Sequence, residues 1–336
     1  MSTKRIKVLF LNPFGNELLD YIKKRIGKYP IDLVIPSDSE RDSLMVLVPD
    51  ADILIGWGSD PELLEKAKQV KLFINPGTGI KQHIENFKAL DKSRNIVLVN
   101  GHGNSYAVAQ HTVALLLSLT NKVTSFHLKM KELREPEGER NTRYFKNLKV
   151  GFLGYGAINT KVHRFLSGFD ISFVAYRRDW SKVKESTITT IDQYSEGQLQ
   201  DFFKESDVVV NSLPATTETK NMVTMKEFKC LGKNGYFINV GRAATVIQED
   251  MYMALKENII AGAALEVWWG KGEPNNGRHD PYQYPFHELD NLIMSPHRAA
   301  NCGGDLDRWD EVIENLIRFS EGRQDLLNIV NIDLEY

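Results

Sequence analysis

The sequence predicts an α/β protein with two doubly wound domains, each built on a parallel sheet. Two observations lead to this prediction. Short apolar runs alternate with amphipathic stretches almost from end to end, which is typical of βαβ units. The length of 336 residues exceeds what one ordinary core needs and suits two domains.

The first series of strands lies in the first third of the chain. Amphipathic stretches separate its members, among them Pro61–Lys68, where Asp60 is a suitable N-cap and Pro61 a suitable first-turn residue. We predict strands over five apolar runs: Ile6–Leu11, Asp32–Ile35, Asp52–Ile55, Lys71–Ile74 and Ile96–Val99.

A long helical pattern from Tyr106 to about Leu133 interrupts this rhythm. Its apolar residues recur at mixed spacing, with three- and four-residue steps among them. The pattern predicts one long helix, and this helix is a plausible bridge between the two domains. It runs into the charged segment Lys131–Arg143.

A second series of strands and helices follows. The segment Trp268–Tyr284 is rich in Gly, Pro, Asn and Asp and predicts a loop, and Asp305–Gly322 predicts a final helix. Six strands, the number that a full dinucleotide-binding fold needs, are predicted over Lys149–Leu153, Ile171–Tyr176, Asp207–Ser212, Gly235–Val240, Ala261–Leu265 and Asn291–Met294.

Composition excludes several classes of protein. A hydrophobic fraction of 42% and a net charge of −2 indicate a globular protein without a nucleic-acid or acidic-membrane footprint. The run Val8–Leu11 is too short for a signal peptide, and Ala107–Leu119 is too short and too polar to span a bilayer. Cys230 and Cys302 have no metal-ligand spacing, so we expect no metal, and we expect both thiols to be buried in a reducing compartment. These features predict a cytoplasmic protein.

A glycine-rich turn, Gly154-Tyr155-Gly156-Ala157-Ile158, follows one predicted strand and opens a helix. This is the context that the dinucleotide fingerprint requires, with Gly154 for the tight turn and Gly156 for close approach of the backbone to a pyrophosphate. The helix would offer its N-terminal N–H groups to the phosphates. Asn159 stands where the fingerprint has its third glycine, so we expect slightly looser helix–strand packing.

The residues after the next strand bear on the choice of cofactor. An acid there would hold the ribose 2′-hydroxyl of NAD, whereas Arg177 and Arg178 follow the strand Ile171–Tyr176 here. Guanidinium groups match a 2′-phosphate, so we favour NADP over NAD. The alternative is that both arginines are surface residues and Asp179 reaches the ribose.

Several further motifs occur in a fixed order along the chain, and with the glycine turn their combination resembles the D-isomer-specific 2-hydroxyacid dehydrogenase family. The resemblance spans about residues 75–300. The motifs are Gly77-Thr78-Gly79, Ala107-Val108-Ala109-Gln110-His111-Thr112, Leu213-Pro214-Ala215-Thr216-Thr217-Glu218-Thr219, Ile238-Asn239-Val240-Gly241-Arg242-Ala243, Ala261-Gly262-Ala263-Ala264-Leu265-Glu266-Val267 and Ser295-Pro296-His297-Arg298-Ala299-Ala300.

The resemblance implies two Rossmann-like domains, of which the substrate domain is discontinuous. Residues 1–103 and 298–336 would form the substrate domain, and residues 104–297 the dinucleotide-binding domain, with the active site in the cleft. The family usually forms homodimers through the cofactor domain, and the helix Tyr106–Leu133 would contribute to that interface.

The resemblance also implies the chemistry and its residues. His297 would be the acid/base, since a histidine exchanges protons near neutral pH. Arg242 would bind the substrate carboxylate and polarise the carbonyl. Glu273 would pair with His297, although its register requires an insertion of two residues in the loop around Trp268-Trp269-Gly270, since Lys271 stands at the ungapped position.

The remaining implied contacts are with the substrate carboxylate and the cofactor. Thr78 and Gly79 would offer backbone N–H groups to the carboxylate, and Pro214 and Glu266 would border the nicotinamide, Glu266 accepting from its carboxamide where the family usually has Asp. The full set of expected cofactor residues is Gly154, Tyr155, Gly156, Ala157, Ile158, Arg177, Arg178, Leu213, Pro214, Thr219, Val240, Gly241 and Glu266.

These residues predict an oxidoreductase that interconverts a 2-oxo acid and a D-2-hydroxy acid, of the glyoxylate/hydroxypyruvate reductase sort. Three alternatives stay open. Formate or phosphoglycerate dehydrogenase activity would use the same fold. A cofactor-sensing protein, like the corepressors that share this fold, would bind NADPH without turnover. A generic dinucleotide binder would lack the catalytic residues altogether.

Overall fold

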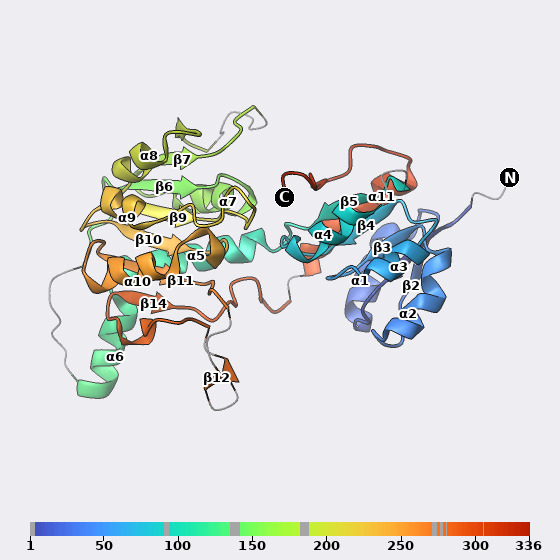
Figure 1. Ribbon diagram of the computed structural model, residues 1–336, viewed down its shortest axis with the longest axis horizontal. Coiled ribbons are helices and arrows are strands. Elements are labelled where there is room, and N and C mark those ends of the chain that lie inside the picture. The colour runs from blue at the N-terminus through green and yellow to red at the C-terminus, as the bar shows by residue number, and fades with distance from the viewer. Residues whose placement is uncertain are drawn as a thin grey trace. The chain divides into compact units, whose positions relative to one another are not determined.

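The structure of the protein is a computed structural model that describes residues 4–90, 94–134, 142–181, 188–270, 274–275, 278–279, 281–304 and 306–336. The chain divides into two compact units (Figure 1). Unit 1 comprises Met1–Asn104 and Gly303–Tyr336, and unit 2 comprises Ser105–Cys302. The expected domain ends at residues 103 and 297 lie one and five residues before the observed ends at 104 and 302.

Unit 1 is a five-stranded sheet with strand order β2-β1-β3-β4-β5, and all its strand pairs are parallel. Residues of α1 and α11 pack in one apolar cluster, and residues of α2, α3 and α4 pack in the other, so helices cover both faces. The elements are β1 Ile6–Phe10, α1 Asn16–Ile26, β2 Ile31–Val34, α2 Arg41–Leu47, β3 Ile53–Ile55, α3 Pro61–Lys66, β4 Leu72–Asn75, α4 Lys81–Ala89, β5 Val97–Asn100 and α11 Asp310–Ser320.

Unit 2 has a parallel sheet of order β14-β11-β10-β9-β6-β7-β8. Counted from β6, the first six strands follow the Rossmann order 3-2-1-4-5-6, and β14 extends the sheet beyond β11. The strands are β6 Lys149–Leu153, β7 Ser172–Tyr176, β8 Asp192–Tyr194, β9 Val208–Asn211, β10 Tyr236–Asn239, β11 Gly262–Leu265 and β14 Leu292–Met294.

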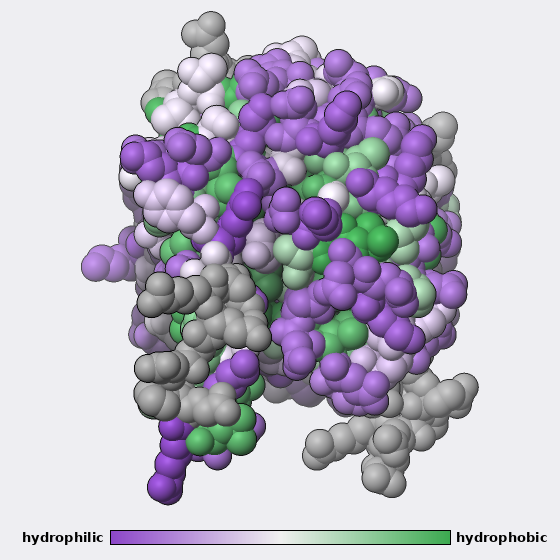
Figure 2. All heavy atoms as spheres, turned by 90° about the vertical axis from the view of Figure 1, so that its left-hand side faces the viewer, coloured by the Kyte–Doolittle hydropathy of each residue, from purple (hydrophilic) through white to green (hydrophobic). Residues whose placement is uncertain are grey.

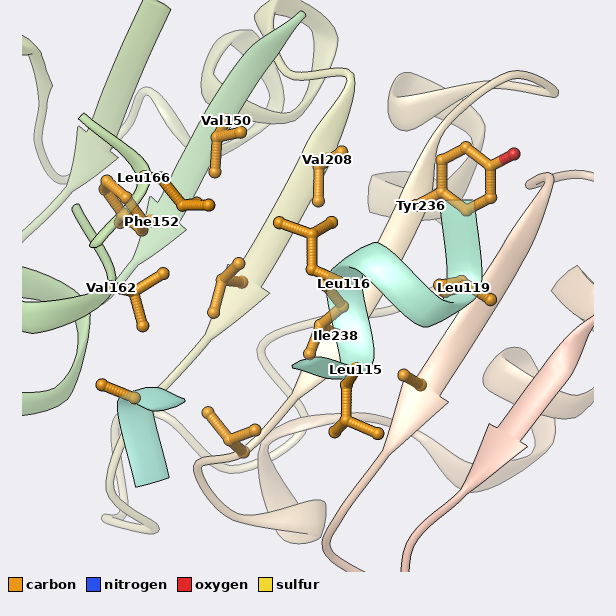
Figure 3. Packing of buried hydrophobic residues seen from close by; sticks show 14 of the residues in the cluster. Leu115, Leu116, Leu119, Val150, Phe152, Val162, Leu166, Val208, Tyr236 and Ile238 are labelled. Atoms are coloured by element: carbon orange, nitrogen blue, oxygen red, sulfur yellow. The ribbon is translucent and has the colours of Figure 1, made fainter. Parts of the chain in front are cut away.

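Helices cover both faces of this sheet as well. Buried residues of α5 (Ser105–Thr120) and α7 (Ala157–Leu166) form one cluster with the sheet. Those of α8 (Leu199–Glu205), α9 (Met225–Leu231) and α10 (Gln248–Lys256) form the other. Figure 3 shows Leu115, Leu116 and Leu119 of α5 over side chains of β6, β9 and β10. The predicted fold class, two doubly wound Rossmann-like domains, is therefore confirmed.

The strand predictions for the two parallel sheets hold, with one strand of these sheets missed. Each of the eleven predicted apolar runs overlaps a strand, with ends that agree to within one residue. The short edge strand β8 was not predicted, because its sequence, Asp192-Gln193-Tyr194, has no apolar run. Strands at the edge of a sheet are less buried, so the hydrophobic signal is weakest there.

The prediction of one long helix over Tyr106–Leu133 is wrong. The structure has α5 and a separate helix α6, Val123–Leu133. Lys122 between them has a φ of +54°, a left-handed conformation that cannot continue a right-handed helix. The side chain of Asn121 donates to the carbonyl of Leu117 at 3.0 Å, which satisfies an acceptor in the last turn of α5.

Two further expectations are corrected. The predicted loop Trp268–Tyr284 contains a short antiparallel pair, β12 Pro274–Asn275 and β13 Arg278–His279. The two cysteines are not buried as expected. Cys230 is only partly buried, and Cys302 is exposed because it lies in an exposed segment after the last strand of unit 2. No helix in the described part of the chain is long and apolar enough to cross a membrane.

Helix α6 differs from the other helices of unit 2 in its exposure. None of its residues is buried, and the exposed fractions of Val123, Leu128, Met130 and Leu133 are 55%, 46%, 51% and 61%. The face in Figure 2 is mostly hydrophilic, and its hydrophobic side chains gather in separate groups. Val123, Met130 and Leu133 lie on one side of α6, and within the described residues nothing buries them.

Candidate active site

The glycine turn follows β6, and the strand order of unit 2 reverses between β6 and β9. Ligands of doubly wound sheets bind at this switch point. Gly154 has a φ of +82°, which side chains rarely tolerate. Gly156 precedes α7, and a Cβ there would meet no atom within 4 Å. The first N–H groups of α7 have no partner within the helix, so the turn offers donors to an anion.

Asn159 does not loosen the helix, contrary to our expectation. Its side chain is fully buried, and its amide donates to the carbonyl of Gly154 at 2.6 Å and to that of Val210 at 3.1 Å. A glycine at this position has no side chain with which to do this. Asn159 therefore connects α7 to the glycine turn and to β9 by hydrogen bonds.

The two arginines after β7 have different environments. Arg177 donates to the backbone carbonyls of Tyr155 and Asp179, so it braces the glycine turn. Arg178 forms an ion pair with Glu218 in the loop after β9. The carboxylate of Asp179 accepts from the N–H and the hydroxyl of Ser181 at 2.8 and 2.6 Å. Arg177 is thus engaged by backbone carbonyls, whereas Arg178 pairs with an exposed carboxylate.

Tyr155 joins the turn to a buried histidine. Its hydroxyl lies 2.7 Å from Nδ1 of His163 in α7, and Nε2 of His163 lies 2.6 Å from the hydroxyl of Thr189. Burial lowers the pKa of His163 to about 4. The ring is therefore neutral near pH 7, and the chain of three side chains is a structural support behind the turn.

The loops after β9 and β10 carry Leu213, Pro214, Val240, Gly241 and Arg242. A Cβ on Gly241 would lie 2.6 Å from the carbonyl oxygen of Leu213, so only glycine lets the two loops approach this closely. In the first loop, the hydroxyl of Thr219 donates to the carbonyl of Pro214 at 2.6 Å. The first loop is thereby closed by its own hydrogen bond, and the second passes close beside it at the edge of the sheet that carries the glycine turn.

Buried asparagines shape these loops, and sequence reasoning missed them. Asn211 donates to Oδ1 of Asn239 at 3.1 Å and to the hydroxyl of Thr245 at 2.8 Å. Oδ1 of Asn211 accepts from the N–H of Leu213, and that of Asn239 accepts from the N–H of Gly241. A buried amide at this edge thus fixes the first turn of each loop.

In unit 1, asparagines at the ends of strands hold the following loop in the same way. Asn75 ends β4, and its amide donates to the carbonyls of Gly77 and Gly79. Asn100 ends β5 and donates to the carbonyl of Thr78 at 2.9 Å. The signal was available, because β4, β5, β9 and β10 each end in asparagine after an apolar run.

The loop that carries Thr78 and Gly79 therefore has its carbonyls engaged from within unit 1. In the residues that the structure covers, the N–H groups of Thr78 and Gly79 donate to no acceptor, and both residues are partly exposed. His83 supports Asn75 from α4, with 3.1 Å between Nε2 and Oδ1, and burial lowers its pKa to about 4. The loop presents two backbone donors that an anion can use.

Arg242 follows β10 and is partly buried. Its guanidinium donates to the carbonyl of Gly241 at 2.8 Å, and within the described ranges no carboxylate pairs with it. Burial lowers the pKa of Arg242, which is the cost of a cation removed from water. A guanidinium held this way is suited to receive a carboxylate from a ligand, which would replace the missing hydration.

His297 lies in the segment after β14. It is exposed and has a φ of +56°, a conformation that non-glycine residues rarely adopt. Glu266 follows the neighbouring strand β11 and is 2% exposed. Its Oε1 accepts from the N–H of Ala299 at 2.6 Å. Glu273, the expected partner of His297, lies outside the described residues.

The structure thus brings the predicted cofactor residues of unit 2 to one edge of its sheet, together with Arg242 and the segment of His297. Thr78 and Gly79 lie in unit 1. No group of three metal-ligating side chains occurs in the described parts of either unit.

Comparison with known proteins agrees with this geometry. The model of a protein family, the D-isomer specific 2-hydroxyacid dehydrogenase NAD binding domain, matches residues 113–299. A glyoxylate/hydroxypyruvate reductase A of Photorhabdus laumondii is 26% identical over 290 residues, which cover 85% of this chain and 88% of the relative. A D-3-phosphoglycerate dehydrogenase of Archaeoglobus fulgidus is 25% identical over 97% of this chain, which spans only 59% of the length of that relative.

Solved structures show the same fold. The NADPH-dependent glyoxylate/hydroxypyruvate reductase of Sinorhizobium meliloti, in complex with NADP and malonate, superposes with a TM-score of 0.73 at 21% identity and covers 98% of both chains. The NAD complex of a D-isomer specific 2-hydroxyacid dehydrogenase from Lactobacillus delbrueckii gives a TM-score of 0.77 at 19% identity over 97% of this chain and 99% of the other. Because the family match covers more than half of the chain and the sheet order and glycine turn agree with it, this protein belongs to the D-isomer specific 2-hydroxyacid dehydrogenase family.

Proposed function

We propose that the protein is an NADP(H)-linked oxidoreductase that interconverts a 2-oxo acid and a D-2-hydroxy acid, of the glyoxylate/hydroxypyruvate reductase sort. The observation that carries the proposal is Arg242. Its guanidinium is partly buried and lies at the edge of the sheet that carries the glycine turn. The described residues give it no carboxylate partner. A small acid would supply one.

The glycine turn fits a dinucleotide. Gly156 has open space where a side chain would lie, and the N-terminus of α7 provides donors for the pyrophosphate. Tyr155, Ala157 and Ile158 line this turn, and Leu213, Pro214, Thr219, Val240 and Gly241 would form the wall that holds the nicotinamide end. When bound, the cofactor supplies or accepts the hydride.

The preference for NADP over NAD is assigned to Arg178. Arg177 already binds two backbone carbonyls, whereas Arg178 pairs with the exposed carboxylate of Glu218. A 2′-phosphate would be a stronger partner for Arg178, because it carries more charge and more acceptor oxygens. The S. meliloti reductase, which shares this fold, is NADPH-dependent.

The chain's own residues would handle the acid and the proton. Arg242 and the N–H groups of Thr78 and Gly79 would bind the substrate carboxylate, and Arg242 would also polarise the carbonyl oxygen. His297 would donate a proton to the developing alkoxide during reduction and accept it during oxidation. Glu273 is proposed to pair with His297 and to hold its tautomer.

The test is NADPH oxidation, with NADH beside it, against glyoxylate, hydroxypyruvate, pyruvate and bulkier 2-oxo acids. We expect turnover with a preference for NADPH. Arg242→Gln should raise KM for the acid and lower kcat/KM at least 100-fold, and His297→Gln should lower kcat. Arg164→Gln in α7 and His287→Gln in the segment Phe286–Glu288, both at exposed positions, are the matched controls.

Two outcomes would count against the proposal. Tight NADPH binding without turnover of any acid would favour a cofactor sensor. Unchanged activity in both Arg242→Gln and His297→Gln would mean that the chemistry depends on other residues.

We also propose a cytoplasmic homodimer, with α6 in its interface. The support for the dimer is the exposed apolar residues Val123, Met130 and Leu133, which lie on one side of α6. Light scattering during gel filtration should give about twice the mass of the chain, and Met130→Glu with Leu133→Glu, two exposed positions on the same side of α6, should give the monomer. A monomeric mass for the unchanged protein would refute this part.

A further inference from the structure

We propose that Glu266 is a positioning residue whose buried carboxylate closes the turn that carries His297. This inference rests on the proposed role of His297. It concerns how the chain holds that histidine, and it assigns the carboxylate of Glu266 to the backbone of unit 2 rather than to a nicotinamide carboxamide.

The first observation is the distance from Glu266 to the turn. Oε1 of Glu266 accepts from the N–H of Ala299 at 2.6 Å, a short bond of the kind that a charged acceptor makes. Ala299 lies two residues beyond His297. The carboxylate therefore fixes one end of the turn directly.

The other end of the turn is held at Ser295. Its N–H donates to the carbonyl of Leu265 at 2.8 Å, and its carbonyl accepts from Nε1 of Trp268 at 2.8 Å. Its hydroxyl lies 3.0 Å from Nε2 of His111, a residue of α5. Backbone and side chain of Ser295 are thus all engaged, and the turn from Ser295 to Ala299 is held at both ends.

His111 also connects the two ends. Its Nε2 lies 3.3 Å from Oε2 of Glu266, and that oxygen has no hydrogen-bond partner in the described residues. A proton on Nε2 of His111 would face both Oε2 of Glu266 and the hydroxyl of Ser295. A carboxylate that is 2% exposed needs such neighbours, because burial of an unpaired charge is costly.

The conformation of His297 explains why the clamp matters. Its φ of +56° is unfavourable for a residue with a Cβ, so the surrounding contacts must enforce it. If Ala299 were released, His297 could relax to negative φ and its ring would move. A displacement of about 1 Å at a reacting group can cost about 100-fold in rate.

The experiment compares Glu266→Ala with Glu266→Gln in the full-length protein. Gln keeps the volume and an acceptor for Ala299, whereas Ala removes both. Hydrogen exchange followed by mass spectrometry measures the peptides that cover residues 295–302, and it needs no activity. We expect Glu266→Ala to speed exchange at Ala299 at least 10-fold and Glu266→Gln to stay within about 3-fold of the unchanged protein.

Kinetics give the second measurement. With a 2-oxo acid that is turned over, Glu266→Ala should lower kcat about 10- to 100-fold while the Kd for NADPH changes less than about 3-fold, and Gln should restore most of kcat. Ser295→Ala, which leaves the buried carboxylate in place, should lower kcat about 3- to 10-fold and serves if Glu266→Ala does not fold. Glu257→Ala, at an exposed position after α10, is the control.

The outcomes separate this inference from the proposed function. Unchanged exchange at Ala299 in Glu266→Ala would overturn the clamp, whatever the activity. A Kd for NADPH that rises 10-fold in both Glu266 variants, with unchanged exchange, would assign the carboxylate to the cofactor instead. Absence of turnover in the unchanged protein would remove the proposed function, yet faster exchange in Glu266→Ala would still support the clamp.

Discussion

The buried histidine behind the glycine turn makes the stability of unit 2 depend on pH. His163 is fully buried, its pKa is lowered by burial to about 4, and both ring nitrogens contact hydroxyls, those of Tyr155 and Thr189. In the unfolded chain its pKa returns to about 6.5. The perturbation is a decrease of pH from 7.5 to 5.

The sign follows from proton uptake. Between pH 6.5 and 4 the unfolded chain binds a proton at His163 and the folded protein does not, so acid favours unfolding. The stability is fully present above pH 6.5 and decreases as pH falls toward 4. At pH 5 the decrease from this one residue is about 2 kcal/mol.

The assay is urea unfolding at both pH values, followed by hydrogen exchange in peptides of β6 and α7, which reports on unit 2 alone. His163→Gln does not titrate, and its amide offers both a donor and an acceptor to the two hydroxyls. We expect the free energy of unfolding of this variant to lose about 2 kcal/mol less than the unchanged protein on going to pH 5. His287→Gln, at an exposed position, is the control, and an equal loss in His163→Gln and the unchanged protein would refute the reasoning.

Three further predictions concern the site. Glu218→Gln removes the exposed carboxylate that competes for Arg178, so the Kd for NADPH in a fluorescence titration should fall about 1.4- to 5-fold while the Kd for NADH stays unchanged. An equal change in both Kd values would contradict this competition. Gly241→Ala should lower the free energy of unfolding by about 1–3 kcal/mol and weaken NADPH binding, because its Cβ would lie 2.6 Å from the carbonyl oxygen of Leu213. Gly168→Ala, whose Cβ would have no atom within 4 Å, should change neither quantity, and equal melting temperatures of the two variants would argue against a clash at Gly241. Asn75→Ala releases the loop of Gly77 and Gly79 and should raise KM for the acid with Kd for NADPH unchanged, whereas an unaltered KM would mean that the loop does not bind substrate.

Local patterns in the sequence were sufficient for the architecture. Apolar runs predict buried strands because helices cover both faces of a parallel sheet, and eleven such runs overlap strands here. The glycine turn was predictable for a similar reason, since Gly154 adopts a φ that few other residues tolerate. Arg242, which follows an apolar strand, was also evident from its motif.

Contacts between segments distant in the chain decided the rest. The sequence does not reveal that Asn159 binds the carbonyls of Gly154 and Val210, or that Arg177 is used by the backbone while Arg178 meets Glu218. The same is true of the break at Lys122, since each flanking segment has a helical pattern of its own.

The carboxylate of Glu266 illustrates the physical reason. The strand that precedes it is evident from its own residues, but the partner of its Oε1 is an N–H that lies 33 residues further along the chain. A residue's period and propensity depend on its neighbours in sequence, and these produce the strand. Hydrogen bonds of a buried polar group depend on what the packed sheet brings within 3 Å, and only the tertiary structure determines that.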